Sequence, residues 1–435
     1  MRQISNDPDL AGPKRLDAAG RQEGRLSSFS ASGPVEPGEI LVAGAGIVGL
    51  AAAIGLAAAG FETILCGAPE RLASGRTVAL LGASTQFLAS LGVREDIERR
   101  GAPLRALRII DDTGSLWRAP TIEFYASEIG LDCFGWNIEN ALLVDALAAQ
   151  AARRSNLRMI ASRIIAYEWG ARSALARCED GRTIEARLVV AADGRGSPAR
   201  TAANIATRVH RLPQTALTTI LAHSRSHAEF SSEFHTRTGP FTLVPLPAGN
   251  DGAQRSSLVW VMSERQSRRR AALEDVRLAA EIETQAQSIH GAMRIAGGRG
   301  VFPLVSQTAI RLTAPRLALV GDAAHVLPPI GAQGLNLGLR DAAWLIETIE
   351  ATRRAGRDAG APETLARYEA SRRGDVGSRS VVINALNFSL ISGFGLSDLA
   401  RSAGLAALGA IGPLRRFAMR EGMSPSWALP RAMRG

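Results

Sequence analysis

Short apolar runs followed by glycine-containing turns recur along this 435-residue chain and predict buried strands. The first run covers residues 40–43. It leads through a glycine-rich turn into an alanine-rich helical segment, which ends before a second apolar run at 63–65. Two further runs end at Val190 and Val320. Since strands that alternate with helices usually form a parallel sheet, this pattern indicates an α/β fold.

A different pattern occupies the middle of the chain. Between residues 209 and 263 hydrophobic positions alternate with polar ones, and Gly, Pro, Asn and Asp separate the stretches. A period of two is typical of an antiparallel sheet with one buried face. Residues 105–124 alternate in the same way around a turn at 111–114, while residues 140–152 have helical spacing. We therefore expect a Rossmann-like domain with an interleaved antiparallel β-sheet domain and C-terminal helices.

These changes of pattern give the domain boundaries that we predict. A disordered leader is expected over residues 1–38, where Pro, Gly, Ser and both charge signs mix without periodicity. The Rossmann-like domain is expected to be discontinuous and to consist of residues 39–104, 133–208 and 312–375. The antiparallel domain consists of residues 105–132 and 209–311, and it is the substrate domain that the resemblance described below implies. A helical tail is expected over residues 376–435.

The turn after the first strand reads GAGIVG over residues 44–49 and matches the dinucleotide-binding fingerprint. Gly44 permits a sharp turn, Gly46 lets the backbone approach a pyrophosphate, and Gly49 lets the helix pack on the strand, while free N–H groups at the helix start attract the anion. The fingerprint usually continues with an acid that binds the ribose. Here its place falls at Cys66 and Gly67. Two alternatives follow: either an acceptor is missing and the change Gly67→Glu would supply it, or another group, such as Glu70 or the backbone, already fills that role.

Two further segments place an acidic residue at the end of a strand, where ligands of open α/β sheets bind. The first contains Asp193 and Gly194. The second begins with Gly321 and Asp322, continues through a proline-stiffened loop with two glycines, and opens a helix. This second arrangement is expected to place a carboxylate beside a ribose or ribitol chain, and to direct backbone N–H groups toward a group that becomes negative.

Composition excludes several classes of function. The net charge is +10, but the arginines are spread along the chain and Lys14 is the single lysine, so we expect no nucleic-acid partner. The three cysteines are far apart and no His has zinc-ligand spacing, which predicts no metal site and fits a cytoplasmic location. Residues 40–61 are uncharged and long enough to cross a bilayer, but five glycines and the immediate return to a strand argue against a membrane span.

Together, the motifs at 44–49, 193–200 and 321–341 resemble the single-component FAD-dependent aromatic monooxygenases, the group that includes 4-hydroxybenzoate hydroxylase. Their order and spacing match over residues 38–375. Within that group the ubiquinone-biosynthesis hydroxylases are most similar in residues 134–140, 321–341 and 413–420. The resemblance implies FAD as cofactor and NAD(P)H as electron donor.

The resemblance also assigns roles to individual residues. Asp322 is expected to bind the ribityl and pyrophosphate region, and Asp193 to support FAD and NAD(P)H binding. Arg76 is expected near a mobile flavin, and Asn140 takes the place where this group often has an arginine. The backbone of residues 331–336 is expected to face the pyrimidine edge of the flavin. The cofactor-binding residues that we predict are Gly44, Gly46, Gly49, Arg76, Asn140, Asp193, Gly321, Asp322, Pro329, Gly331, Gly334, Leu335 and Asn336.

The implied activity is that of a monooxygenase that uses O2 to hydroxylate the ring of an aromatic, polyprenylated phenol in ubiquinone biosynthesis. Pro245 and Leu246 are expected to line its substrate pocket. No catalytic base is assigned, because Tyr125, Tyr167 and Tyr368 lie in no recognisable motif. Two alternatives stay open: a hydroxylase of a soluble aromatic acid, and a flavin-poor accessory protein of a ubiquinone-biosynthesis complex, which the missing acid motivates.

The C-terminal segment has a mixed character. Residues 399–420 combine leucines and alanines with arginines, and such a segment can lie on an anionic bilayer or pack against the protein itself. The uncharged stretch at 380–397 contains asparagines and serines, which favours a packed helix over a membrane span. We therefore expect a cytoplasmic protein. If residues 399–420 lie on an anionic bilayer, we expect it to contact the inner membrane peripherally.

Overall fold

The computed structural model describes residues 35–68, 75–114, 119–329, 332–391, 403–404, 406–423 and 429–434. Residues 1–34 of the predicted leader lie outside the described residues. Its last residues, 35–38, belong to strand β1 (Val35–Ala43), and Val35 already pairs with Thr183 in the neighbouring strand. The leader prediction is therefore wrong for residues 35–38.

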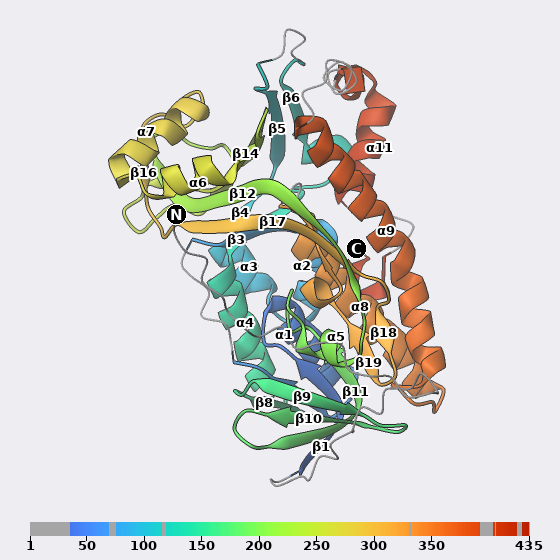
Figure 1. The fold of residues 1–435 in the computed structure, drawn as a ribbon. Helices are drawn as coiled ribbons and strands as arrows, with labels where there is room; N and C mark the ends of the chain where they lie inside the picture. Colours follow the sequence, from blue (N-terminus) through green and yellow to red (C-terminus); the bar gives the residue numbers. More distant parts are fainter. Residues whose placement is uncertain are drawn as a thin grey trace, which may run out of the picture. The chain divides into compact units, whose positions relative to one another are not determined.

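An eight-stranded, mainly parallel sheet carries the dinucleotide-binding turn among the described residues (Figure 1). Its order is β18-β19-β11-β1-β2-β8, and β9 and β10 extend from β11 as antiparallel strands. Besides β1, these strands are β2 (Thr63–Cys66), β8 (Leu157–Ile160), β9 (Ile164–Trp169), β10 (Ala174–Cys178), β11 (Thr183–Ala191), β18 (Thr313–Ala314) and β19 (Leu317–Leu319). The predicted runs ending at Val190 and Val320 thus lie beside β1, where parallel strands are buried on both faces.

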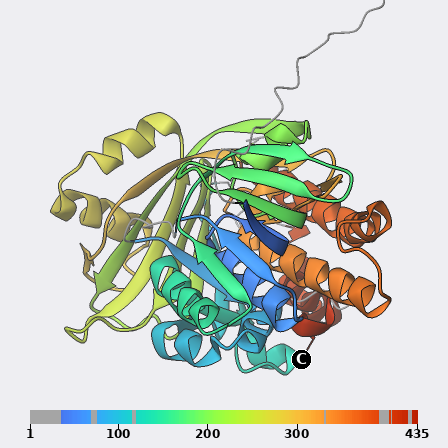
Figure 2. The same cartoon turned by 90° about the horizontal axis from the view of Figure 1, so that it is seen from below.

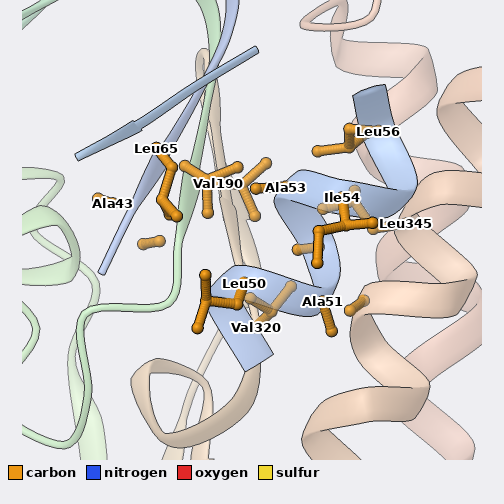
Figure 3. Packing of buried hydrophobic residues seen from close by; sticks show 14 of the residues in the cluster. Ala43, Leu50, Ala51, Ala53, Ile54, Leu56, Leu65, Val190, Val320 and Leu345 are labelled. Atoms are coloured by element: carbon orange, nitrogen blue, oxygen red, sulfur yellow. The ribbon is translucent and has the colours of Figure 1, made fainter. Parts of the chain in front are cut away.

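Helix α1 (Ile47–Ala58) connects β1 to β2 and is buried along most of its length. Figure 3 shows its side chains between the strand residues Leu65 and Val190 on one side and Leu345 of α8 (Gln333–Arg354) on the other. A Cβ atom on Gly55 would lie 2.3 Å from Ile346, so this glycine lets α1 approach α8 closely. Helix α4 (Asn140–Ala152) packs beside α1. In Figure 2 these helices lie on one side of β1, and β9 and β10 lie on the other.

A nine-stranded sheet, mainly antiparallel, has the order β20-β17-β12-β15-β14-β13-β5-β6, with β16 beside β12. Helices α6 (Glu264–Ala271) and α7 (Asp275–Gln285) pack against it (Figure 1). Its core includes Phe241, whose ring makes edge-to-face contacts with Phe234 and Trp260. The strands are β5 (Ala106–Asp111), β6 (Ile122–Tyr125), β12 (Thr207–His223), β13 (Phe230–Thr236), β14 (Gly239–Leu246), β15 (Gln254–Met262), β16 (Met293–Ile295), β17 (Gly300–Ala309) and β20 (His325–Val326). Because β20 comes from outside the predicted ranges of this domain, the sheet crosses the predicted boundary; the division into domains stays a prediction.

The remaining described elements form a small sheet, further helices and short 3-10 turns. A three-stranded sheet contains β3 (Thr77–Leu81), β7 (Gly135–Glu139) and β4 (Ala102–Pro103). The other α-helices described are α2 (Gly82–Ser90), α3 (Arg94–Arg100), α5 (Pro198–Ala202), α9 (Pro362–Ile391) and α11 (Gly412–Met423). Single 3-10 turns occur at η1 (Ala126–Ile129), η2 (Gly321–Ala323) and η3 (Arg431–Met433). Within the described parts of the chain, every helix is too short or too polar to cross a bilayer.

Candidate functional site: a dinucleotide cavity

The glycine-rich turn between β1 and α1 has the geometry that a pyrophosphate needs. Gly44 has a φ of +105°, and a Cβ atom there would lie 2.3 Å from the carbonyl oxygen of Ala192. A Cβ on Gly49 would lie 1.9 Å from the carbonyl oxygen of Gly44, whereas a Cβ on Gly46 would meet nothing within 4 Å. Helix α1 begins at Ile47 without a side-chain cap and without an acidic residue in its first turn. Its first N–H groups can therefore bind an anion.

A cavity of about 1030 Å³ opens in front of this turn. The predicted cofactor residues that line it are Gly44, Gly46, Arg76, Asn140, Asp193, Asp322 and Leu335. Those that are described but do not line it are Gly49, Gly321, Pro329, Gly334 and Asn336, and Gly331 lies outside the described residues. The wall also includes residues 161–164 and 179–180, which follow β8 and β10 and which no motif indicated. Their place after strands is the signal by which the sequence could have suggested them.

Asp193 follows β11, and the two oxygens of its carboxylate differ in their hydrogen bonding. Its Oδ2 accepts a hydrogen bond from the N–H of Ala199 at 3.1 Å. Its Oδ1 is buried and has no hydrogen-bond partner among the described residues. Burial raises the pKa of Asp193, and the hydrogen bonds from Ser197 and Ala199 offset only part of that effect. A buried acceptor without a partner at a cavity wall is a group that a ligand donor can satisfy.

Asp322 lies in the turn η2, which is hydrogen-bonded to a cluster of buried charged side chains. The carboxylate of Asp341 accepts a hydrogen bond from the N–H of Gly321 at 3.0 Å and from Nε of Arg372 at 2.7 Å. Its Oδ2 is also hydrogen-bonded to Nε2 of His325 at 2.6 Å. Burial by itself would raise the pKa of Asp341, but His325 and Arg372 outweigh burial and hold this pKa below its usual value.

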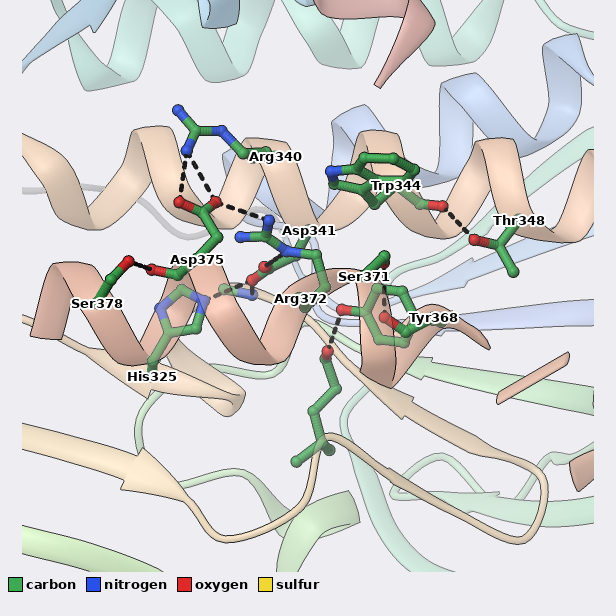
Figure 4. A network of polar contacts seen from close by, with 12 residues as sticks. His325, Arg340, Asp341, Trp344, Thr348, Tyr368, Ser371, Arg372, Asp375 and Ser378 are labelled. Carbon is green, nitrogen blue, oxygen red and sulfur yellow. Dashed lines mark hydrogen bonds and ion pairs between the residues drawn. The ribbon is translucent and has the colours of Figure 1, made fainter. Parts of the chain in front are cut away.

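The same network continues between helices α8 and α9 (Figure 4). Arg340 of α8 and Arg372 of α9 both donate to the carboxylate of Asp375, each at 2.8 Å. All three side chains are buried. Opposite charges therefore compensate one another in the interior, and the start of α8 is tied to α9 at the level of the cavity.

The first turn of α8 is fixed by Asn336. Its Oδ1 accepts a hydrogen bond from the N–H of Leu81 at 2.9 Å, and its Nδ2 donates to the carbonyl oxygens of Ala79 and Ala332. Ala332, the residue before α8, has a left-handed φ of +54°. The side chain of Asn336 therefore positions the helix start, while Leu335 beside it lines the cavity.

Arg76 and Asn140 meet at the wall of the cavity. The N–H of Asn140 donates to the carbonyl oxygen of Arg76 at 2.9 Å, and the buried Oδ1 of Asn140 has no partner among the described residues. The Arg76 guanidinium lies over the ring of Phe302 in β17, with 4.1 Å between Cζ and the ring centre. This contact joins the cavity wall to the antiparallel sheet.

Pro245 and Leu246 end strand β14 and are both buried. The carbonyl oxygen of Pro245 accepts a hydrogen bond from Nδ2 of Asn137 at 2.8 Å, and that of Leu246 lies 3.2 Å from Nε2 of His227. Neither residue belongs to the wall of the cavity described above. Their contact with substrate stays a prediction.

The geometry at Gly67 disfavours the alternative in which Gly67→Glu supplies a missing ribose acceptor. A Cβ atom on Gly67 would lie 2.8 Å from the nitrogen of Ala45 and 3.2 Å from Cα of Gly44. These are backbone atoms of the pyrophosphate turn, so a side chain at position 67 must displace that turn. The thiol of Cys66 does not replace the acid either, because its Sγ donates to the carbonyl oxygen of Ser162 and lies 3.6 Å from Sγ of Cys178.

The residues present fit FAD. The free space around the backbone of Gly46 and the uncapped helix start suit a pyrophosphate. The side-chain oxygens of Asp193 and Asn140 that lack partners among the described residues suit hydroxyl or N–H groups. Arg76 adds a cation to the wall of the same cavity. Fold and site together define a dinucleotide-binding α/β protein with an added antiparallel sheet.

Comparison with known proteins gives the particular family. A model described as the FAD binding domain matches residues 38–382. The chain is 35% identical to the ubiquinone hydroxylase UbiL of Rhodospirillum rubrum over 421 residues, which cover 93% of this chain and 96% of the relative. It is 30% identical to the 3-demethoxyubiquinol 3-hydroxylase of Escherichia coli over 406 residues, 88% of this chain and 98% of the relative. The solved structure of p-nitrophenol 4-monooxygenase PnpA from Pseudomonas putida superimposes with a TM-score of 0.73 at 19% identity, covering 89% of this chain and 98% of that one.

The chain therefore belongs to the FAD binding domain family. It is an FAD-dependent aromatic-ring monooxygenase that takes its electrons from NAD(P)H. The predicted fold class and the resemblance to this group are confirmed.

Proposed function

We propose that this protein hydroxylates the aromatic ring of a prenylated phenol in ubiquinone biosynthesis. The observation that carries the proposal is the 35% identity to UbiL of Rhodospirillum rubrum, which extends over 96% of that ubiquinone hydroxylase. In the overall reaction the phenol, O2, NAD(P)H and a proton give the hydroxylated ring, water and NAD(P)⁺. One oxygen atom enters the ring and the other is reduced to water.

Bound FAD supplies the transfer of electrons from NAD(P)H and the activation of O2. The protein binds and orients this cofactor. The N–H groups at the start of α1 and the open backbone of Gly46 bind the pyrophosphate, and Asp322 accepts hydrogen bonds from the ribityl chain and its neighbours. The oxygens of Asp193 and Asn140 that lack partners among the described residues accept further hydrogen bonds from the cofactor.

Two positive features act on the flavin end of the cavity. Arg76 contributes its guanidinium, and the first turn of α8 contributes backbone N–H groups held in place by Asn336. Fixed N–H dipoles favour a negatively charged ring over a neutral one. We propose that these groups would hold the flavin ring and would favour negative charge on it. The buried sheet around Pro245 and Leu246 supplies the apolar wall for a prenylated substrate.

We propose in addition that α11 contacts an anionic membrane. The α11 surface, defined as Ile411, Leu414, Arg416, Phe417 and Arg420, combines exposed apolar and basic side chains on one short helical segment. Ile411, Leu414 and Phe417 are 49%, 41% and 64% exposed and recur at every third position. Exposed apolar residues flanked by arginines are typical of helices that lie in the interface of an anionic bilayer. A prenylated substrate is dissolved in such a bilayer.

The opposite side of α11 is anchored to the protein. Arg415 pairs with Glu128 of η1 at 2.6 Å and lies over the ring of Phe124, while Met419 is buried in the same cluster. This anchoring leaves the α11 surface directed away from its docking partners. It therefore supports membrane contact over simple packing for the described part of the tail.

Deletion of the protein in its own organism tests the proposed reaction. The deletion strain should make no ubiquinone and should accumulate a prenylated precursor that lacks one or more ring oxygens. Reintroducing the wild-type chain under ¹⁸O2 should restore ubiquinone that carries ¹⁸O, whereas the variant Asp322→Ala should restore little. Normal ubiquinone in the deletion strain, with NAD(P)H oxidation stimulated by a small aromatic acid, would instead establish the soluble-substrate hydroxylase. Full restoration by Asp322→Ala would support the accessory protein.

A further inference from the structure

The cavity lacks an acid where the second strand ends, yet a phenol side chain lines the same region. Cys66 and Gly67 end β2 without a carboxylate. Tyr167 of β9 belongs to the cavity wall together with them. No motif in the sequence pointed to this tyrosine, because β9 is an antiparallel addition to the sheet whose position over the cavity depends on the fold.

The ring of Tyr167 is held in one orientation. It stacks on the ring of Trp169, with 5.2 Å between the ring centres and 3° between the ring planes. Strand β9 also packs against α5, which follows the Asp193 segment. A rigid aromatic side chain loses little conformational entropy when a ligand binds to it.

The hydroxyl group of Tyr167 is available to a ligand. It forms no hydrogen bond with the described residues, and Tyr167 belongs to the cavity wall. Burial raises the pKa of Tyr167, and the nearby Asp193, Cys66 and Cys178 raise it further. The phenol is therefore neutral near pH 7 and can both donate and accept a hydrogen bond.

Other residues of the cavity wall locate Tyr167 relative to the sheet. Asp193 follows β11 and Cys66 ends β2, and these two strands flank β1 on either side. Tyr167 thus shares one cavity wall with the carboxyl ends of β2 and β11 and with the glycine-rich turn that follows β1. In a dinucleotide-binding fold this edge receives the pyrophosphate and the adjoining ribose.

We propose that Tyr167 is a further FAD-binding residue whose hydroxyl group contacts the ADP half of the cofactor. This contact takes over part of the role of the acid that is absent at Cys66 and Gly67. Of the acidic residues at the wall, Asp180 is already bound to Arg182 at 2.6 Å. The inference rests on the FAD site, and it assigns to that site a residue from the antiparallel strands.

The change Tyr167→Phe tests this contact with two ligands. The purified apoprotein should bind FAD roughly three- to tenfold more weakly, which is the loss expected for one neutral hydrogen bond. ADP, which contains the ribose and phosphates but no flavin, should lose affinity by a similar factor when it competes with FAD. FMN, which lacks the adenosine half, should bind the variant and the wild type equally.

The variant Tyr125→Phe is a matched control, because Tyr125 is exposed and bonds to Glu123 away from the cavity. It should bind FAD, ADP and FMN as the wild type does. Thermal unfolding of the apoproteins should show the same midpoint for Tyr167→Phe and the wild type. Unchanged FAD binding, a loss for FAD without a loss for ADP, or an equal loss for FMN would each overturn the proposal. A wild-type chain that binds no FAD would instead remove the cofactor site itself.

Discussion

The carboxylate of Asp341 accepts a 3.0 Å hydrogen bond from the N–H of Gly321, which connects helix α8 to the turn that carries Asp322. Asp341 is fully buried, and its other contacts go to His325 and Arg372. Gly321 has a φ of +60°, so the turn needs both a glycine and an acceptor for its first N–H. The position of Asp322 in the cavity wall thus depends on the carboxylate of Asp341, which does not itself line the cavity.

Removing this charge should destabilise the protein strongly. The change Asp341→Ala leaves Arg372 with one buried partner fewer and leaves the N–H of Gly321 without an acceptor. We expect it to lower the free energy of unfolding of the apoprotein by about 3–5 kcal/mol, measured by urea denaturation. The control Glu98→Ala, which breaks an exposed pair with Arg94, should have little effect. Equal effects of the two changes would contradict a supporting role for Asp341.

Replacing Asp322 should affect FAD binding more than it affects the stability of the apoprotein. Its side chain is exposed at the cavity wall, so the change Asp322→Ala should alter the unfolding of the apoprotein far less than Asp341→Ala does. Loss of a hydrogen bond to a charged acceptor costs about 1.5–3 kcal/mol, which corresponds to roughly ten- to hundredfold weaker FAD binding. Titration of the apoprotein with FAD measures this. A variant with wild-type affinity would show that Asp322 does not contact the cofactor.

The local part of the site could be predicted from the sequence, because its physical causes are local. The turn at residues 44–49 requires glycines within a few positions of one another, and Asp193 and Asp322 each come shortly after the end of a recognisable strand. The same is true of the start of α4 at Asn140, where helical spacing begins. Short-range sterics and strand ends are properties that a sequence displays directly.

The rest of the site depends on contacts between distant parts of the chain. Asn336 was predicted to face the flavin through its backbone, but its side chain bonds to Leu81 and Ala79, a pairing that only the folded chain brings together. The steric conflict at Gly67 arises from the pyrophosphate turn, and the approach of Tyr167 arises from the position of β9. Neither hydrophobic periodicity nor a short motif predicts contacts between residues that are so far apart in the sequence.

A side chain at position 67 should weaken FAD binding. Even Gly67→Ala introduces a Cβ atom 2.8 Å from the backbone of the glycine-rich turn, so the turn must move away from its pyrophosphate-binding position. We expect both Gly67→Ala and Gly67→Glu to bind FAD more weakly than the wild type in a titration. Gly374→Ala is the matched control, because a Cβ there meets open space on α9. Tighter binding by Gly67→Glu would restore the original hypothesis of a missing acceptor.

His290 should make stability depend on pH. Burial, together with His223 and His227, lowers the pKa of His290 to about 3, and neither ring nitrogen has a hydrogen-bond partner among the described residues. The unfolded chain binds a proton at this residue below about pH 6.5, while the folded chain remains neutral. Folding stability should therefore fall as the pH decreases from about 6.5 toward 3, by at most about 1.4 kcal/mol per pH unit from this group.

Urea denaturation between pH 7.5 and 4 measures this slope. The variant His290→Leu should have a shallower slope than the wild type over that range. His210→Gln is the control, because His210 is exposed and its removal should leave the slope unchanged. A wild-type slope in His290→Leu would mean that other groups control acid unfolding.

The α11 surface should bind anionic vesicles. Wild-type protein should sediment with vesicles that contain an anionic phospholipid and far less with purely zwitterionic ones, and added salt should reduce the bound fraction. Each exposed arginine near such a surface contributes about 1 kcal/mol, so Arg416→Gln with Arg420→Gln should weaken binding roughly thirtyfold. Phe417→Ser should also weaken it, because its 64% exposed ring is the largest apolar side chain of this surface. Val276→Ser, a change at an 81% exposed position on α7, should have no effect. Binding that is equally strong for zwitterionic vesicles, or that survives all three changes in α11, would show that this surface does not carry the membrane contact.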